Sequence, residues 1–263
     1  MVLEYFLNSY IKERPLFLSI LRAKEAYLYQ KYLPLKKPIL DVGCGDGFFA
    51  KIAFERKSKI KNVPYIIDIG LDIEGSRIDE AREANIYKKL VIYDGKKISY
   101  PNNYFSTIIS NSVLEHVLDL QNVLQEIHRV LRPKGIFLTT VMAKEWEENL
   151  CGTKLFGDFY KKWMRKKQVH VNLLSLEEWN KYFLLAGFNI YKEIGYVTPR
   201  ACCWLDILHY VSIPSLVTYK IFGRWVLFPE IIDYICPKKY LTEVISPNVG
   251  PEKAGALFYV LSK

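Results

Sequence analysis

The chain is predicted to fold as an α/β protein with a doubly wound, mostly parallel sheet and an α-rich cap. Five short apolar runs have the length and composition of buried parallel strands. They are residues 39–42, 65–71, 90–93, 105–110 and 136–141. Helical patterns separate several of these runs, and strands that alternate with helices form parallel sheets. With 263 residues, 50% of them hydrophobic, the chain can build one sizeable core and a cap.

The first half of the chain is expected to begin with one or two amphipathic helices over 3–33, broken near Pro15. The strand at 39–42 leads into a helix over about 46–56. A basic, polar loop is expected at 57–64 and a short helix at 75–84.

Residues 119–131 have apolar side chains at helical spacing, and the turn Pro133-Lys134-Gly135 separates them from the fifth strand. Ser175 to Glu178 has the pattern of a capping box, which opens a helix that ends at Gly187. Strands are expected at 188–194 and, at the end of the chain, at 256–261.

A glycine-rich loop follows the first strand, in the sequence Ile39-Leu40-Asp41-Val42-Gly43-Cys44-Gly45-Asp46-Gly47. Alternate glycines allow a sharp turn and let a ligand approach the backbone. The N–H groups at the start of the next helix face the same space. Two carboxylates, Asp41 and Asp46, disfavour a phosphate and favour a cationic ligand.

This loop resembles motif I of the class I S-adenosylmethionine (SAM) methyltransferases, whose cofactor carries a sulfonium and an ammonium. Three further segments match that pattern in order: Asp72 at the end of a strand, Asp94-Gly95 at the end of the next, and residues 103–135. The last of these departs from the pattern at Lys134, where the family has glycine. The resemblance covers residues 36–142 and implies a Rossmann-like sheet. A dinucleotide-binding dehydrogenase is disfavoured because the loop lacks G-x-G-x-x-G spacing.

The resemblance implies that Asp72 binds the ribose hydroxyls, Asp94 the adenine amino group, and Asn111 the methionine part of SAM. The full set of expected cofactor-binding residues is Asp41, Gly43, Cys44, Gly45, Gly47, Asp72, Ile73, Asp94, Gly95 and Asn111.

Three residues are candidates for catalysis. Glu115 and His116 follow the fourth strand, where the methyl group is expected, and a histidine can deprotonate a hydroxyl acceptor near neutral pH. His116 could instead pack under the substrate or cap the next helix. His170 follows a basic run and is a second candidate, with a structural role as its alternative.

The resemblance and the composition together divide the chain into four parts. These are N-terminal helices at 1–35, a SAM-binding core at 36–143, a substrate cap at 144–254 that contains a helix and strand within 175–195, and a final core strand at 255–263.

The composition limits compartment and partners. The net charge of +9 favours anionic partners. The five cysteines contain no C-x-x-C pair, which favours a reducing, cytoplasmic setting and no metal site. The first residues lack the features of a signal peptide.

Two C-terminal segments bear on the acceptor. Residues 154–167 combine basic and aromatic side chains, and residues 201–235 are apolar but interrupted by charges and proline. Both suit a membrane interface. The run at 154–167 could instead be a solvated face or contact a nucleic-acid strand, and 201–235 could equally be a lid or a homodimer surface.

The expected reaction is therefore methyl transfer from SAM to an oxygen or nitrogen of a small or amphipathic, lipid- or glycan-linked acceptor. An RNA methyltransferase is an alternative that the sequence disfavours, because Ser110-Asn111-Ser112-Val113 stands where such an enzyme could have an N-P-P-Y-type tetrad. No nucleic acid partner is therefore expected. The alternative from another class is an inactive SAM-fold protein that binds a partner or a membrane through 201–235.

Overall fold

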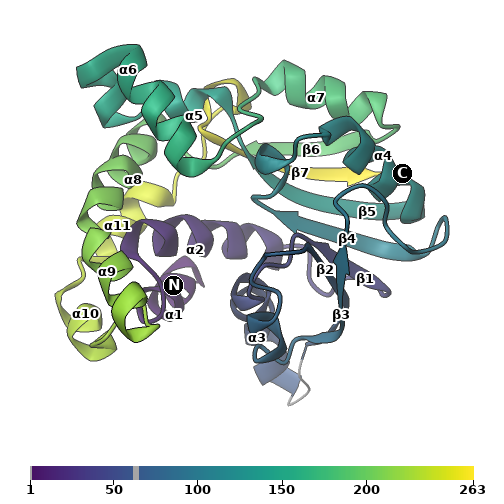
Figure 1. Cartoon of the computed structure of the whole chain (residues 1–263), viewed down its shortest axis with the longest axis horizontal. Helices are drawn as coiled ribbons and strands as arrows, with labels where there is room; N and C mark the ends of the chain where they lie inside the picture. The colour runs from purple at the N-terminus through teal and green to yellow at the C-terminus, as the bar shows by residue number, and fades with distance from the viewer. Residues whose placement is uncertain (1, 62–64) are drawn as a thin grey trace.

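The computed structural model describes residues 2–61 and 65–263. Their centre is a seven-stranded sheet with the strand order β3-β2-β1-β4-β5-β7-β6 (Figure 1). The strands β1 to β5 are parallel, and β7 runs antiparallel to both of its neighbours. Their bounds are β1 Ile39–Val42, β2 Ile67–Ile73, β3 Tyr87–Tyr93, β4 Phe105–Asn111, β5 Leu131–Met142, β6 Asn189–Gly195 and β7 Ala256–Ser262. The predicted α/β class with a mostly parallel sheet is confirmed.

Apolar side chains cover both faces of the central strands, as the apolar runs predicted. In β1, Ile39 belongs to one buried cluster and Leu40 to the other, and Ile108 and Ile109 of β4 divide in the same way. Successive strand residues point to opposite faces, so each central strand contributes to two cores. One core includes α2 (Leu16–Gln30) and α3 (Phe48–Lys61), and the other includes α4 (Leu120–Val130) and α7 (Leu176–Leu185).

The predicted break near Pro15 is confirmed, since α1 (Val2–Ile11) ends before it and α2 begins after it. The capping box is also confirmed at Ser175, whose side chain accepts from the backbone N–H of Glu178. Lys134, which stands where the family has glycine, has a left-handed backbone with φ of 62°. The turn expected at 133–135 lies within β5, where the register with β4 shifts.

Two local predictions were wrong. The loop expected at 57–64 is helical as far as Lys61, because no glycine or proline interrupts α3 there; residues 62–64 lie outside the described residues. The helix expected at 75–84 is a series of turns around a short 3-10 helix, η1 (Glu80–Arg82). Only Ile78 and Ala81 are buried between 75 and 84, too little apolar contact to hold a longer helix.

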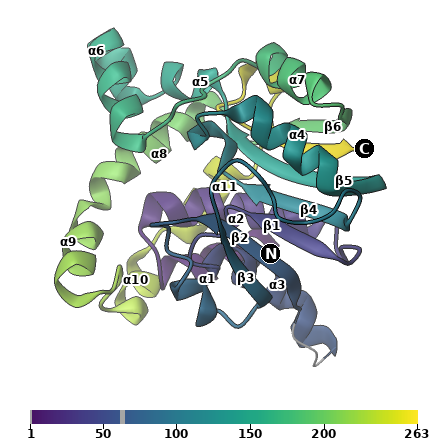
Figure 2. The ribbon, with the colours of Figure 1, turned by 45° about the vertical axis from the view of Figure 1, so that its right-hand side comes forward.

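Six helices lie beside the sheet together with α1 and α2, along one side of the molecule in Figures 1 and 2. They are α5 Lys144–Glu148, α6 Cys151–Gln168, α8 Pro199–Val211, α9 Ile213–Phe222, α10 Pro229–Ile235 and α11 Lys238–Ile245. α7 and β6, which lie within the same part of the sequence, belong to the core. Within α9 and α10 no residue is buried.

A disulfide joins Cys151 of α6 to Cys203 of α8, a pairing that the sequence did not predict. It fastens the two cap helices to each other across 52 residues of chain. Among the described helices, none is long and apolar enough to span a bilayer on its own; α8 and α9, bent by 43° at their junction, reach that length and composition only as a pair.

Candidate active site

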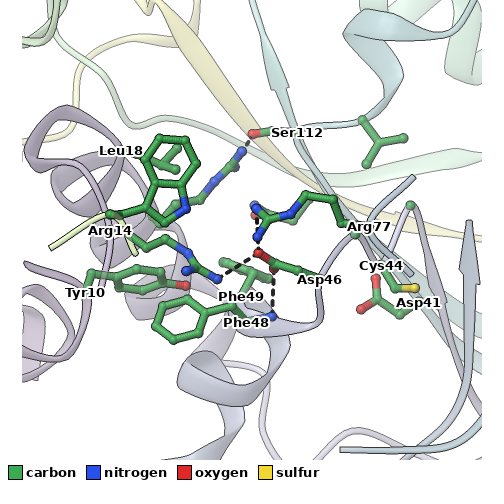
Figure 3. A pocket seen from close by; sticks show the side chains of 16 residues that line it. Tyr10, Arg14, Leu18, Asp41, Cys44, Asp46, Phe48, Phe49, Arg77 and Ser112 are labelled. Carbon is green, nitrogen blue, oxygen red and sulfur yellow. Dashed lines mark hydrogen bonds and ion pairs between the residues drawn. The ribbon is translucent and has the colours of Figure 1, made fainter. Parts of the chain in front are cut away.

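A cavity of about 370 Å³ lies where the glycine loop leaves β1 and the chain leaves β4 (Figure 3). Parallel α/β sheets bind ligands at this edge, where the strand order reverses between β1 and β4. The N-terminal helices form the opposite wall. The lining residues are Tyr10, Arg14, Leu18, Arg22, Asp41, Gly43, Cys44, Gly45, Asp46, Phe48, Phe49, Arg77, Asn111, Ser112, Val113 and Trp225.

Two glycines give the loop its shape. Gly43 has φ of +75°, and a Cβ there would lie 2.4 Å from Val113, so the loop needs a residue without a side chain. Gly45 has φ of +55° with open space around it. The space beside Gly45 belongs to the cavity, so a ligand can reach the backbone of the loop.

Two buried or partly buried carboxylates stand at the sheet side of the site. Burial raises the pKa of Asp41 to about 7, although a hydrogen bond from the Tyr87 hydroxyl at 2.6 Å opposes the shift. Burial also raises the pKa of Asp72, while hydrogen bonds from the backbone N–H groups of Gly45 and Ile73 act against it. A cationic ligand would stabilise the ionised form of both carboxylates.

Asp46 is not free to attract a cation, which corrects the argument from the loop's two acidic residues. Its carboxylate lies 2.7 Å from Arg14 and 3.0 Å from Arg77, and it also accepts from the backbone N–H of Phe48 (Figure 3). Arg14 comes from the turn between α1 and α2, so this double ion pair ties the N-terminal helices to the glycine loop. Among the described residues that line the cavity, Asp41 is the acidic residue without an ion-pair partner.

A buried carboxylate organises the opposite wall. Glu25 of α2 is fully buried and lies 2.6 Å from Arg22; it accepts from Asn111 at 2.8 Å and from Tyr196 at 2.7 Å. Burial opposes the charge on Arg22, but Glu25 outweighs it and raises the pKa of the guanidinium. Arg22 also donates to Ser112 at 2.6 Å. The network therefore holds a permanent cation at the cavity wall, next to the end of β4.

The structure brings half of the expected cofactor residues to this cavity, namely Asp41, Gly43, Cys44, Gly45 and Asn111. The other half lie outside its lining: Gly47, Asp72, Ile73, Asp94 and Gly95. Asp72 lies behind the loop, at the end of β2. Asp94 is exposed, and its carboxylate accepts from the backbone N–H groups of Lys96 and Lys97, which is the pattern of an aspartate that begins a turn.

The three candidate catalytic residues lie together, although none lines the cavity. The rings of His116 and His170 are 5.1 Å apart, and Glu115 lies beside both. Burial raises the pKa of Glu115 to about 8 and lowers that of His170 to about 4. His116 is exposed, and its Nδ1 lies 2.9 Å from the carbonyl oxygen of Val169. Whether any of them acts as a base stays a prediction.

Sequence reasoning missed the wall made by Tyr10, Arg14, Leu18 and Arg22, and it missed Trp225. These residues come from helices and a cap loop that no motif marks. The amphipathic pattern of 3–33 predicted helices but could not place them over the glycine loop.

A second cavity, of about 460 Å³, adjoins the first and is lined mainly by apolar side chains. Arg14 and Trp225 line both cavities. Its other lining residues come from α1, the start of α2, the junction of α8 and α9, the loop at 226–228 and α10: Ile11, Leu16, Val211, Ser212, Pro214, Ser215, Thr218, Val226, Leu227, Phe228, Ile231, Ile232, Ile235, Cys236 and Pro237.

Comparisons with known proteins show the family to which the chain belongs. Over 157 residues the chain is 27% identical to a malonyl-[acyl-carrier protein] O-methyltransferase of Legionella pneumophila, covering 57% of this chain and 49% of the relative, or about half of the relative's length. Over 173 residues it is 30% identical to a tRNA (carboxymethyluridine(34)-5-O)-methyltransferase of Schizosaccharomyces pombe, covering 64% and 68%.

A solved SAM-dependent methyltransferase from Mesorhizobium loti has the same fold, with a TM-score of 0.54 and 17% identity over 91% of this chain and 98% of the other. Residues 10–193 match the model of a family described as a methyltransferase domain. The chain belongs to this family and is a class I methyltransferase that uses S-adenosylmethionine as its cofactor.

Proposed function

We propose that the chain methylates an oxygen or nitrogen atom of an amphipathic acceptor, whose apolar part lies in the second cavity. The observation that carries this proposal is the adjacency of the two cavities, which share Arg14 and Trp225. SAM occupies the first cavity, and the second offers an apolar chain a place to leave water. A nucleophile at the end of such a chain would lie at the boundary between them.

The chemistry places few demands on the protein. Methyl transfer is an in-line displacement at the sulfonium carbon, so holding the nucleophile at attack distance supplies much of the rate. A base is needed only if the acceptor is a hydroxyl; Glu115, His116 and His170 are the candidates for that role. The two relatives act, by their names, on oxygen atoms of acceptors with malonyl or carboxymethyl groups, which favours an oxygen nucleophile.

A second candidate is a tRNA acceptor, favoured by the similarity to the Schizosaccharomyces pombe enzyme and by the net charge of +9. The apolar lining of the second cavity favours a chain over a nucleotide. We further propose that the protein acts in the cytoplasm at a membrane face, because an amphipathic acceptor partitions into a membrane surface.

The test is transfer of labelled methyl from SAM to paired acceptors with the same nucleophile and either a long or a short alkyl chain, with tRNA as a third arm. Four extra buried methylenes contribute about 3 kcal/mol, so kcat/KM should favour the long chain by about 100-fold. Equal kcat/KM for both chains would contradict an apolar subsite, and methylation of tRNA alone would replace the proposal by the second candidate.

A pair of variants locates the subsite. Ile231 lines the second cavity and is 55% exposed, so Ile231→Asp is expected to fold and to remove the advantage of the long chain. Ile221, 66% exposed on α9 and absent from the lining, provides the matched control Ile221→Asp. Calorimetry should show unchanged SAM binding by both variants.

A further inference from the structure

We propose that Glu115, His116 and His170 form a site for one divalent transition-metal ion beside the SAM cavity. Each residue offers one ligand atom, and these atoms all lie within 4.8 Å of one another. No metal site was expected from the sequence, because the cysteines form no C-x-x-C pair. Glu115 and His170 are 55 positions apart and belong to no ligand motif. The fold brings them together where the chain leaves β4, two residues after the cavity-lining Val113.

The buried carboxylate of Glu115 lacks the partners that a buried polar group needs. Its residue is 1% exposed, and neither carboxylate oxygen makes a hydrogen bond of normal geometry within residues 2–61 and 65–263. Leaving such a group unpaired costs about 1–3 kcal/mol, and more if it is charged. The backbone N–H groups of Glu115 itself and of Met142 lie near it, and on another side lie the two imidazoles. A cation held there would satisfy the carboxylate.

In its neutral form, the His116 ring is held in the tautomer that leaves Nε2 available to a metal. Its Nδ1 lies 2.9 Å from the carbonyl oxygen of Val169, which can only accept, so Nδ1 carries the proton. Nε2 then keeps a free lone pair. Histidines that bind metals commonly donate their other N–H to a backbone carbonyl in this way, which fixes the ring and its tautomer.

His170 is held by the segment around it. The backbone N–H groups of Val171 and Asn172 donate to the carbonyl of Glu115 at 2.8 and 2.9 Å. The side chain of Asn172 donates to the carbonyls of Leu114 and Val117 at 3.0 and 2.6 Å. The Nδ1 atom of His170 is buried and has no hydrogen-bond partner in the described part of the chain. The site is therefore arranged before an ion arrives.

The ligand set indicates which ions fit. Two imidazoles and one carboxylate suit Zn²⁺ and similar transition metals, whereas Mg²⁺ and Ca²⁺ prefer oxygen ligands. The exposed His116 gives an ion a route in and leaves coordination positions open to water or to an acceptor oxygen. The nearby cations Arg22 and Arg165 are already paired, with Glu25 and Glu147. The inference goes beyond the proposed function, since it depends on these side chains and not on the acceptor.

The experiment is a calorimetric titration of the chelator-treated, tag-free chain with Zn²⁺, and a parallel titration with Co²⁺ followed by visible absorption, both without reductant. One ion per chain is expected. His116→Ala and His170→Ala should each weaken metal binding by at least about tenfold. Removal of a residue that only supports a metal ligand already costs about tenfold in affinity, and these histidines are proposed as ligands themselves. His128→Ala and Cys236→Ser, which alter possible ligands elsewhere, should bind like the wild type.

Absence of saturable binding, or binding that survives both histidine variants, would overturn the site. Glu115→Gln is a third variant, but it changes a buried group and could fail to fold. The two histidine variants keep the test decisive, because their SAM affinity and thermal unfolding report the fold independently. If the wild type does not bind SAM, that result would contradict the proposed cofactor site and the proposed function. The metal titration would still test the metal site.

Discussion

The carboxylate of Asp72 accepts a hydrogen bond from the backbone N–H of Gly45 across 2.6 Å, so the end of β2 holds the glycine loop. Its other oxygen accepts from the N–H of Ile73 at 2.8 Å. The residue expected to bind the ribose therefore also fixes the loop that encloses the cofactor. Removing this side chain should affect both contacts at once.

Asp72→Ala should weaken SAM binding while the protein stays folded. A hydrogen bond to a charged group contributes about 1.5–3 kcal/mol, so the dissociation constant should rise by about 10- to 150-fold. Isothermal titration calorimetry measures this directly. Asp79→Ala is the control, because Asp79 is exposed and forms only a surface ion pair with Arg82. An unchanged dissociation constant for Asp72→Ala would show that Asp72 does not bind SAM and only ends the strand.

Gly45→Val should abolish SAM binding. The glycine has φ of +55°, and the open space beside it belongs to the cavity in which we propose that the cofactor binds. A branched side chain would fill that space and strain the backbone. Gly223→Val separates these effects, since Gly223 has φ of +68° and open surroundings but lies outside the cavity lining. SAM binding by Gly45→Val as tight as by Gly223→Val would place the cofactor elsewhere.

The part of the site that sequence could predict is the part built from contiguous motifs. The strand, loop and helix around Gly43 and Gly45 form one local unit, and their order along the chain identified the sheet edge. Arg14, Arg22 and Trp225 could not be predicted, because tertiary packing of the N-terminal helices and the cap brings them to the cavity. The pairing of Cys151 with Cys203 has the same cause: α6 and α8 meet only in the folded chain.

The same reasoning explains the candidate metal site. The sequence marks Glu115 and His116 as a pair because they follow β4. It marks His170 separately, because this residue follows a basic run. Their convergence depends on hydrogen bonds between the segment at 169–172 and the chain after β4, which no sequence pattern encodes.

SAM affinity should depend on pH through Asp41. Burial raises the pKa of this carboxyl to about 7, so much of the free protein carries a neutral Asp41 just below that pH. A cationic cofactor prefers the ionised form, and binding must then release a proton. Affinity should rise by up to about tenfold per pH unit as the pH increases toward the pKa, and level off above it.

Calorimetry in buffers of different ionisation enthalpy measures both the affinity and the proton release. Asp41→Asn removes the titrating group and keeps its shape, so its affinity should lack this dependence and no proton should be released by this site. Parallel pH profiles for the wild type and Asp41→Asn would contradict the role of Asp41.

The outer surface of the cap has an unusual share of exposed apolar side chains. Ile221 and Phe222 of α9 are 66% and 61% exposed, and Tyr234 of α10 is 91% exposed. Two tryptophans of the apolar segment 201–235 are engaged within the protein: Trp204 packs against Tyr240, and Trp225 stacks on Tyr219. A membrane contact would therefore use α9 and α10.

We expect the protein to co-sediment with anionic vesicles at low salt. Basic side chains near the surface contribute about 1 kcal/mol each, and salt screens this attraction. Binding that remains at high salt should fall in the double variant Ile221→Ser, Phe222→Ser, because it depends on buried apolar area. Leu184→Ser with Leu185→Ser is the matched control on α7, far from α9 in Figures 1 and 2. Wild-type protein that stays in the supernatant at low salt would exclude the membrane contact, and a doubled mass in solution would then assign the surface to a homodimer.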